Sequence, residues 1–331
     1  MQFQSAGLTA LMTLLASVAS PLFVPTAQAT QTRQTAPAVQ VLVINPSMQA
    51  QAADSARWLK EANAFLDAGK PDQALTLFQQ VIDADSKNLE AWIGKGTSLY
   101  YLERYDDAIT AYKKATELNP RSVAAWVGMG NALDDSKQPQ AALTAYDKAL
   151  ALDAKDANVW YNRGVTLGRL RRYQEAITAY DKAVRLRPTY SSAWYNRGIA
   201  LSRLQRYQEA LASYDQVVKL EPSRADGWLN RGNAQFDLKR YQEAVKSYDQ
   251  AIAIQSENED AWFNRGVALM NLKRYQEAIA AFDKTLKINP NNADARQNRD
   301  SLLKKVQQSF NQEAVSAVYP PMIRWPASDN A

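Results

Sequence analysis

Apolar and polar positions repeat along the centre of the chain with a period of 34 residues. Tryptophan occupies the same position in seven consecutive segments, and alanine or glycine follows four positions after each one. Alanine lies 16 positions after each tryptophan, and tyrosine or phenylalanine lies 20 positions after it. The seven tryptophans are Trp58, Trp92, Trp126, Trp160, Trp194, Trp228 and Trp262. A fixed period of this length predicts one structural unit that is copied seven times.

The spacing inside one repeat predicts a pair of helices. In the repeat of residues 157–190, Trp160 and Gly164 share one side of a first helix, because an α-helix turns about 100° per residue. Ala176 and Tyr180 share one side of a second helix, after a short turn. Two such helices form an antiparallel hairpin, and the small residues allow the two backbones to approach closely. One hairpin cannot bury its apolar side alone, so neighbouring hairpins must stack.

Seven repeats and four flanking segments account for the whole chain. Residues 1–29 predict a signal peptide and residues 30–54 a linker, whereas residues 293–313 predict a capping helix and residues 314–331 an extended or disordered tail. We place the repeats, which together cover residues 55–292, at residues 55–88, 89–122, 123–156, 157–190, 191–224, 225–258 and 259–292. The predicted fold class is all-α.

The residues at these offsets resemble the tetratricopeptide repeat, which also has a period of 34 residues. The run Trp160-Tyr161-Asn162-Arg163-Gly164, followed by Arg172-Tyr173-Gln174-Glu175-Ala176, is similar to repeats common in bacterial and especially cyanobacterial members. Lys95, Met129 and four arginines depart from the family, which favours leucine at their position. The resemblance implies a right-handed superhelical solenoid of seven hairpins plus a C-terminal capping helix. It also implies that the first helices line a concave groove that binds partner polypeptide segments.

The amino-terminal segment has features of an export signal. An apolar stretch from Ala6 to Val24 precedes Ala27-Gln28-Ala29, which has the small residues that signal peptidase accepts. We therefore expect an exported protein, periplasmic or extracytoplasmic, with no stable membrane span after cleavage. No basic residue precedes Arg33, although signal peptides normally begin with positive charge. A cytoplasmic protein with an N-terminal tail remains the alternative.

Two residue types are absent, and their absence excludes several kinds of chemistry. The chain has no cysteine and no histidine, so it cannot form disulfides, and zinc, haem and iron–sulfur sites lose their usual ligands. Catalysis by a Cys–His pair or a Ser–His–Asp triad is excluded for the same reason. The repeats cover 238 residues, which leaves no segment long enough for a catalytic domain. We expect no enzyme activity, no catalytic residue, no cofactor and no metal site.

Charge is distributed unevenly along the repeats. The formal net charge is +5, which is too small to indicate nucleic acid as a partner. Residues 55–156 contain 12 basic and 15 acidic residues, whereas residues 157–292 contain 21 basic and 14 acidic residues. The later repeats should therefore favour acidic partner segments.

The side of each first helix opposite the tryptophan is free to bind a partner. An asparagine recurs there in four repeats, beside a large apolar residue, and an arginine lies further along two of the helices. The candidate groove residues are Asn162, Asn196, Asn230, Asn264, Tyr161, Tyr195, Leu229, Phe263, Arg169 and Arg203. A row of amides can pair with the backbone of an extended peptide, and it resembles the asparagine row of O-linked glycosyltransferases that carry such repeats. Alternatively, the amides bond within the repeat, for instance to the neighbouring helix.

A second periodic row consists of arginines. Arg163, Arg197, Arg231 and Arg265 lie at the margin of the buried stripe rather than at the centre of the groove. We expect their aliphatic stems to cover the neighbouring unit and their charged ends to pair with carboxylates of the Glu175 or Asp181 type.

Two functions remain from different classes. The first is a non-catalytic scaffold for protein–protein interaction, acting as an assembly factor for protein partners that the sequence does not identify. The second is a structural protein that assembles with copies of itself through the end repeats or the C-terminal tail. A homo-oligomer that grows with concentration in the absence of a partner would distinguish the second function from the first.

Overall fold

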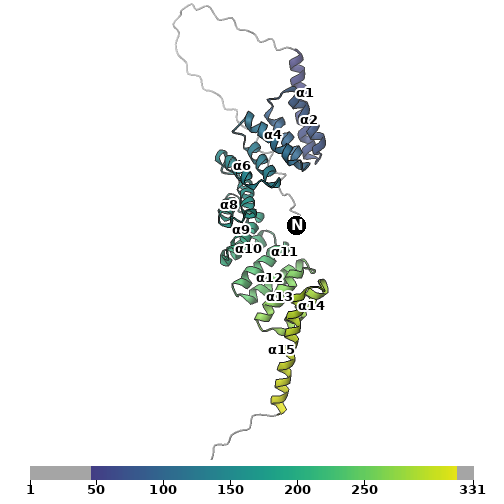
Figure 1. Ribbon diagram of the computed structural model, residues 1–331, viewed down its shortest axis with the longest axis vertical. Helices are drawn as coiled ribbons and strands as arrows, with labels where there is room; N and C mark the ends of the chain where they lie inside the picture. The colour runs from purple at the N-terminus through teal and green to yellow at the C-terminus, as the bar shows by residue number, and fades with distance from the viewer. Residues whose placement is uncertain (1–45, 319–331) are drawn as a thin grey trace, which may run out of the picture. The chain divides into compact units, whose positions relative to one another are not determined.

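Residues 46–318 are described by the computed structural model, and within this range every regular element is an α-helix (Figure 1). The fifteen helices of the described range confirm the predicted all-α fold. The chain divides into two compact units, Met1–Asp153 and Ala154–Ala331, which we call unit 1 and unit 2. The signal peptide predicted for residues 1–29 and the segment Tyr319–Trp325 lie outside the described residues.

Unit 1 contains three helical hairpins in its described part. The helices are α1 (Pro46–Asp67), α2 (Pro71–Ala84), α3 (Leu89–Tyr101), α4 (Tyr105–Leu118), α5 (Val123–Asp135) and α6 (Pro139–Leu152). Each pairs with the next as the repeats predict. Helix α1 begins at Pro46, inside the segment 30–54 that we interpreted as a linker, so the end of that segment is helical.

Unit 2 contains four hairpins and a terminal helix. The helices are α7 (Ala157–Arg169), α8 (Tyr173–Leu186), α9 (Ser191–Arg203), α10 (Tyr207–Leu220), α11 (Ala225–Asp237), α12 (Tyr241–Ile254), α13 (Glu259–Asn271), α14 (Tyr275–Ile288) and α15 (Ala293–Val318). Ala295 and Leu302 of α15 are buried in one cluster with Phe282 of α14, as a capping helix requires. Helix α15 ends at Val318, beyond the predicted boundary at residue 313.

Six of the seven hairpins close around a glycine on the first helix and an aromatic ring on the second, and the first hairpin has Ala62 in place of the glycine. In the hairpin of α9 and α10, a β-carbon built on Gly198 would lie 2.6 Å from Cε1 of Tyr214. Tyr214 is only 1% exposed, so its ring fills the space that the glycine leaves. Gly164 and Gly232 meet Tyr180 and Tyr248 in the same way. The small residues of the repeat are therefore required by close helix packing.

The turn inside each hairpin depends on one residue with positive φ. Gly69 serves in the first hairpin, with φ of 68°, but a residue with a side chain serves in the other six. At Gln205, for example, φ is 59°, and the next amide, that of Arg206, donates to the carbonyl of Leu201. This left-handed residue ends the first helix and reverses the chain. The other five are Glu103, Lys137, Arg171, Lys239 and Lys273.

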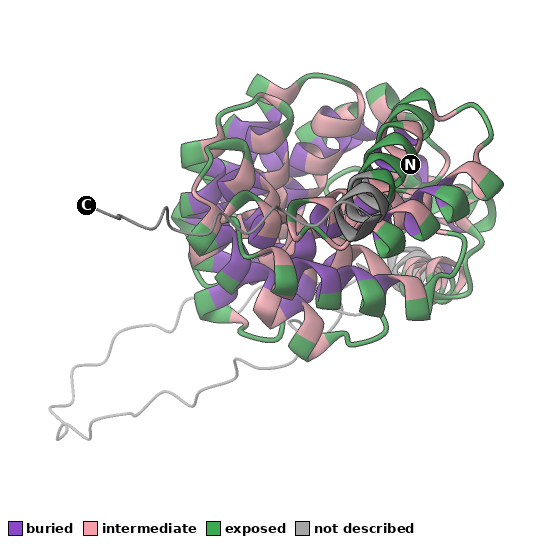
Figure 2. Ribbon diagram, turned by 90° about the horizontal axis from the view of Figure 1, so that it is seen from below, coloured by how far each residue is buried: buried purple, intermediate pink, exposed green. Residues whose placement is uncertain are grey.

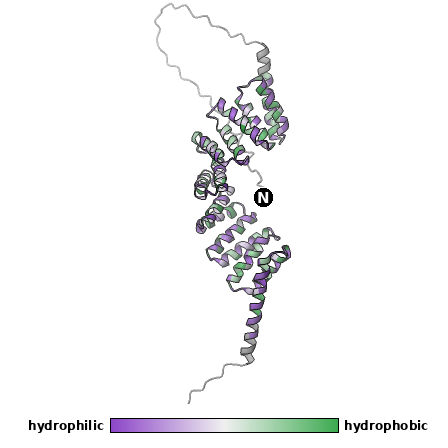
Figure 3. Ribbon diagram, in the orientation of Figure 1, coloured by the Kyte–Doolittle hydropathy of each residue, from purple (hydrophilic) through white to green (hydrophobic). Residues whose placement is uncertain are grey.

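The hairpins of each unit stack so that the first helices lie on one side. In unit 2, α7 contacts α9 and α11 contacts α13, whereas successive second helices of the described range have no comparable contact. The first helices are therefore the closer-spaced set, which makes their side the inner one within the unit. Buried residues lie where helices meet, and the helices carry hydrophobic and hydrophilic residues on different sides (Figures 2 and 3).

Candidate functional site

All ten predicted groove residues belong to the first helices of unit 2. Helix α7 carries Tyr161, Asn162 and Arg169; α9 carries Tyr195, Asn196 and Arg203; α11 carries Leu229 and Asn230; and α13 carries Phe263 and Asn264. Arg169 and Arg203 are exposed and the other eight are half-buried. We call the surface formed by these helices the first-helix face.

The asparagine amides join one first helix to the previous one. Nδ2 of Asn196 donates to the Tyr161 hydroxyl at 3.1 Å, and Nδ2 of Asn230 donates to the Tyr195 hydroxyl at 3.1 Å. Nδ2 of Asn264 donates to Oδ1 of Asn233 at 3.0 Å. The alternative that we considered, bonding to a neighbouring helix, therefore holds for these three amide nitrogens. Their Oδ1 atoms accept no hydrogen bond from any residue that the structure describes.

Tyr161 is part of an aromatic cluster at the start of the first-helix face. Its ring centroid lies 4.8 Å from that of Tyr190, the residue that precedes α9. The guanidinium of Arg187 lies 4.8 Å from the Tyr190 ring and donates to Oδ1 of Asn158 at 3.1 Å. A cation over an aromatic face is attracted by the negative charge of that face. The contacts hold both rings in place beside Asn196.

Tyr195 repeats this arrangement one hairpin later, with an arginine in place of the second tyrosine. The guanidinium of Arg224 lies 4.1 Å from the Tyr195 ring centroid. Arg224 also forms ion pairs with Asp226 at 2.7 Å and Glu221 at 3.2 Å. Arg224 therefore contacts two carboxylates and the Tyr195 ring at the same time, and the Tyr195 hydroxyl is bonded to the amide of Asn230.

Tyr190 and Arg224 occupy the position where a helix is normally capped by a short polar side chain. Asn88, Ser122 and Asp156 cap α3, α5 and α7 in this way, and Asn258 caps α13. Neither α9 nor α11 has a side-chain cap. A missing cap destabilises a helix by about 1 kcal/mol. Neither residue was among the predicted groove residues, although the lack of a short polar residue at both cap positions is visible in the sequence.

Burial disfavours ionisation of the tyrosine hydroxyls of this surface. It raises the pKa of Tyr161 and Tyr190 above the ordinary value for tyrosine. The pKa of Tyr195 is also raised, first by burial and then by the nearby negative charge of Asp226. Tyrosine hydroxyls are protonated at neutral pH with or without this shift, so those of the first-helix face can both donate and accept hydrogen bonds.

The periodic arginines pair with carboxylates across successive hairpins, as predicted. Nε of Arg197 lies 2.7 Å from Oδ1 of Asp181, and Arg231 and Asp215 are also 2.7 Å apart. Arg265 pairs with Asp249 at 2.6 Å. These ion pairs lie on the side of the second helices, away from the first-helix face.

The described residues form neither a metal site nor a membrane-spanning helix. No group of three or more histidine, cysteine, aspartate or glutamate residues is placed to hold a metal ion within residues 46–318. None of the helices in that range combines the length and the apolar character needed to cross a bilayer.

Solved structures with similar folds come from repeat proteins. A tetratricopeptide repeat protein of Cytophaga hutchinsonii is 18% identical, covers 72% of this chain and 98% of its own C-terminal part, and has a TM-score of 0.63. YrrB, a TPR protein with an unusual peptide-binding site, is 24% identical and has a TM-score of 0.55, over 58% of this chain and 99% of its own. MamA is 23% identical with a TM-score of 0.50, over 52% and 94%. These likenesses show the fold.

Sequence patterns of known families cover most of the repeat region. A tetratricopeptide repeat pattern matches residues 93–157, 127–191, 161–217 and 195–259, and a second one matches residues 259–292. The pattern of anaphase-promoting complex, cyclosome, subunit 3 matches residues 38–115. No curated protein matches the chain. The tetratricopeptide matches together span residues 93–292, more than half of the sequence, and confirm the resemblance. The chain belongs to the tetratricopeptide repeat family.

Proposed function

We propose that this protein is a non-catalytic scaffold that holds an extended segment of a partner protein on the first-helix face of unit 2, as an assembly factor does. The observation that carries the proposal is the use of Tyr190 and Arg224 at two cap positions. Both residues give up the stabilisation of a cap and instead contact Tyr161 and Tyr195. Local rules of helix design are most often broken where a surface has a function.

The chemistry of this surface suits a polypeptide backbone. The Oδ1 atoms of Asn196 and Asn230 point to no donor among the described residues, so they can accept N–H groups of a partner. The half-buried rings of Tyr161 and Tyr195 offer apolar area, and aromatic residues are common anchors in interfaces. YrrB, a protein of the same fold with a peptide-binding site, supports the same class of partner.

The hydrogen bonds of the asparagines determine what replacing these residues should do. If their amides were free, replacing Asn196, Asn230 and Asn264 by alanine would weaken binding and leave stability unchanged. The hydrogen bonds to Tyr161 and Asn233 predict a loss of both, of about 1 kcal/mol in unfolding free energy for each bond. The asparagines therefore position the tyrosines as well as offering their oxygens.

A photo-crosslinking residue placed on each side of unit 2 tests the proposal. The first variant carries the crosslinker at Leu229, on the first-helix face, and the matched control carries it at Ala212, an exposed residue of the second helix α10. We expect the Leu229 variant to crosslink to a discrete partner in the native cell, and the Ala212 variant not to. Crosslinking from Ala212 alone would overturn the proposal. Crosslinks only between copies of this chain would instead favour self-assembly.

We also propose that the protein is exported and acts outside the cytoplasm. The proposal rests on Ala27-Gln28-Ala29 after an apolar stretch. Intact mass spectrometry of the protein from its native cell should find a chain that begins at Thr30. A chain that retains residues 1–29 would contradict cleavage, and its recovery with cytoplasmic proteins would contradict export.

A further inference from the structure

The second-helix side of unit 2 has a crevice between successive hairpins, and an arginine fills each one. Between α8 and α10, Arg197 of α9 donates to Oδ1 of Asp181 at 2.7 Å and to Oγ of Ser213 at 2.6 Å. Between α10 and α12, Arg231 of α11 makes the same bonds to Asp215 and Ser247. Each of these two crevices is closed by a cation, a carboxylate and a hydroxyl group, and the carboxylate neutralises the charge of the arginine.

The equivalent crevice in unit 1 lacks the arginine and the aspartate, and like the crevice of Arg265 it has an alanine in place of the serine. It lies between α2 and α4, above α3, and contains Lys95, Gln79 and Ala111 in the places of the arginine, the aspartate and the serine. Nζ of Lys95 donates to Oε1 of Gln79 at 2.7 Å and lies 5.2 Å from the Trp92 ring centroid. A neutral amide thus replaces the carboxylate, and Lys95 has no ion pair with any described residue.

Nearby carboxylates are already occupied. Asp83 accepts a hydrogen bond from Nε2 of Gln79 at 2.7 Å, so the amide stands between this carboxylate and Lys95. Asp107 is paired with Arg104 at 2.6 Å. Lys95 therefore lines this crevice with a positive charge that no carboxylate of the described residues neutralises.

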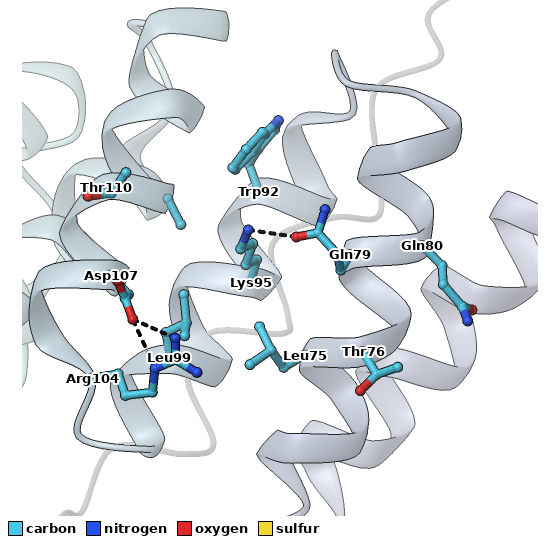
Figure 4. A pocket seen from close by; sticks show the side chains of 11 residues that line it. Leu75, Thr76, Gln79, Gln80, Trp92, Lys95, Leu99, Arg104, Asp107 and Thr110 are labelled. Carbon is cyan, nitrogen blue, oxygen red and sulfur yellow. Dashed lines mark hydrogen bonds and ion pairs between the residues drawn. The ribbon is translucent and has the colours of Figure 1, made fainter.

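The crevice around Lys95 contains a cavity of about 540 Å³ (Figure 4). Leu75, Trp92, Leu99 and Ala111 provide an apolar wall, and Lys95 lies among them with its ammonium group toward Gln79. The volume lies within the range of about 300–1,000 Å³ that is typical of small-ligand pockets, and such pockets combine apolar walls with a few polar groups. The charged group and the apolar wall define the kind of ligand that would fit.

We propose that this cavity binds an amphipathic carboxylate, which has one carboxylate group on a compact apolar body. The ligand's carboxylate would pair with Lys95 as Asp181 pairs with Arg197, and its apolar body would lie between Leu75, Leu99 and Trp92. The site is in unit 1 on the second-helix side, so it goes beyond the polypeptide surface proposed for unit 2. A partner for the cation is expected because a half-buried charge is stabilised by an opposite charge.

Titration of the full-length protein with 4-phenylbutyrate tests the charge requirement directly. The matched probe is 4-phenylbutanol, which has the same apolar body without the carboxylate. We expect the carboxylate to perturb the NMR signal of the Trp92 indole N–H with a dissociation constant of about 1 mM, and the alcohol to bind at least about tenfold more weakly. A third titration compares acetyl-Leu-Phe with its C-terminal amide. If the acid form binds more tightly than 4-phenylbutyrate and the amide does not, a peptide C-terminus is the better source of the carboxylate. Equal binding of acid and alcohol would overturn the proposal.

Two variants separate loss of the site from loss of the fold. Lys95→Met introduces the residue that the next repeat carries at this position, Met129, so the hairpin should still fold. Gln79→Asp supplies an internal carboxylate, as Asp181 does for Arg197. We expect each variant to keep the circular dichroism spectrum and to weaken 4-phenylbutyrate binding at least about tenfold. Wild-type affinity in both folded variants would show that Lys95 is not the receptor for the ligand.

Discussion

Replacing Gly198 by alanine tests the contact between glycine and an aromatic ring that six of the seven hairpins share. The added methyl group would lie 2.6 Å from Cε1 and 2.7 Å from Cζ of Tyr214, whereas ordinary contacts begin at 3.4 Å. Tyr214 is 1% exposed, so its ring cannot move without displacing its neighbours. Overpacking of this kind typically destabilises a protein by about 1–3 kcal/mol. Alanine is a better helix former than glycine by about 1 kcal/mol, which offsets part of this loss. We expect a net loss of about 1–2 kcal/mol in unfolding free energy.

The same substitution at Gly168 is the matched control. Gly168 also lies on a first helix, but a β-carbon there would meet only the Tyr180 hydroxyl, at 3.7 Å. Without a clash, the helix preference of alanine should raise the unfolding free energy by about 0.5–1 kcal/mol. Two identical substitutions on equivalent helices should therefore have effects of opposite sign.

Urea unfolding followed by far-ultraviolet circular dichroism measures both variants. Because repeat arrays can unfold in parts, hydrogen exchange of the α9 and α10 amides should accompany the measurement. We expect faster exchange in these two helices for Gly198→Ala. If Gly198→Ala were as stable as the wild type, or if both variants were destabilised equally, the close approach of the two helices would not be the reason for the glycine.

Three other substitutions probe different contacts. Arg197→Met should lower the unfolding free energy by about 1 kcal/mol, because its side chain and that of Asp181 are 16% and 34% exposed, and thermal unfolding should show no such change for the exposed Arg172→Met. Burial raises the pKa of Tyr214 to about 12, so its contribution to stability is complete below pH 10 and is lost as the pH rises through 12, at about 1.4 kcal/mol per pH unit. The unfolding free energy, measured by urea titration at each pH, should fall less steeply between pH 10 and 12 for Tyr214→Phe than for the wild type. Gln205→Gly should stabilise the turn by about 0.5 kcal/mol in the same assay, because glycine adopts positive φ without strain, and a loss of stability would contradict that account.

The sequence was sufficient to predict the helices and their pairing because those depend on local periodicity. Trp160, Gly164 and Tyr180 recur at fixed offsets, and the same offsets determine which sides of two helices are buried. The Arg197–Asp181 ion pair followed from the same reasoning, since both residues recur with the repeat. The predicted ends of the helical region were less accurate: α1 starts at Pro46, inside the predicted linker, and α15 ends at Val318, beyond the predicted residue 313.

The surface chemistry required the structure because it depends on contacts between residues of different hairpins. Tyr190 lies in a connection, outside the helical pattern, and its contact with Tyr161 depends on how the next hairpin is stacked. The amide of Asn196 could be placed on the correct helix, but its hydrogen bond to the Tyr161 hydroxyl depends on side-chain geometry. The cavity beside Lys95 is lined by residues of three helices, α2, α3 and α4, so it could be found only once their packing was known.

The identical ion pairs between hairpins make the repeats of unit 2 interchangeable parts. Removal of residues 225–258 would bring Arg265 opposite Asp215, in the place that Arg231 now occupies, and Asn264 opposite Tyr195 in the place of Asn230. No buried charge would lose its counterpart, because each module offers the same acid on one side and the same base on the other. A gene that gains or loses whole repeats could thus lengthen or shorten the partner-binding surface in uniform steps, without redesigning any junction.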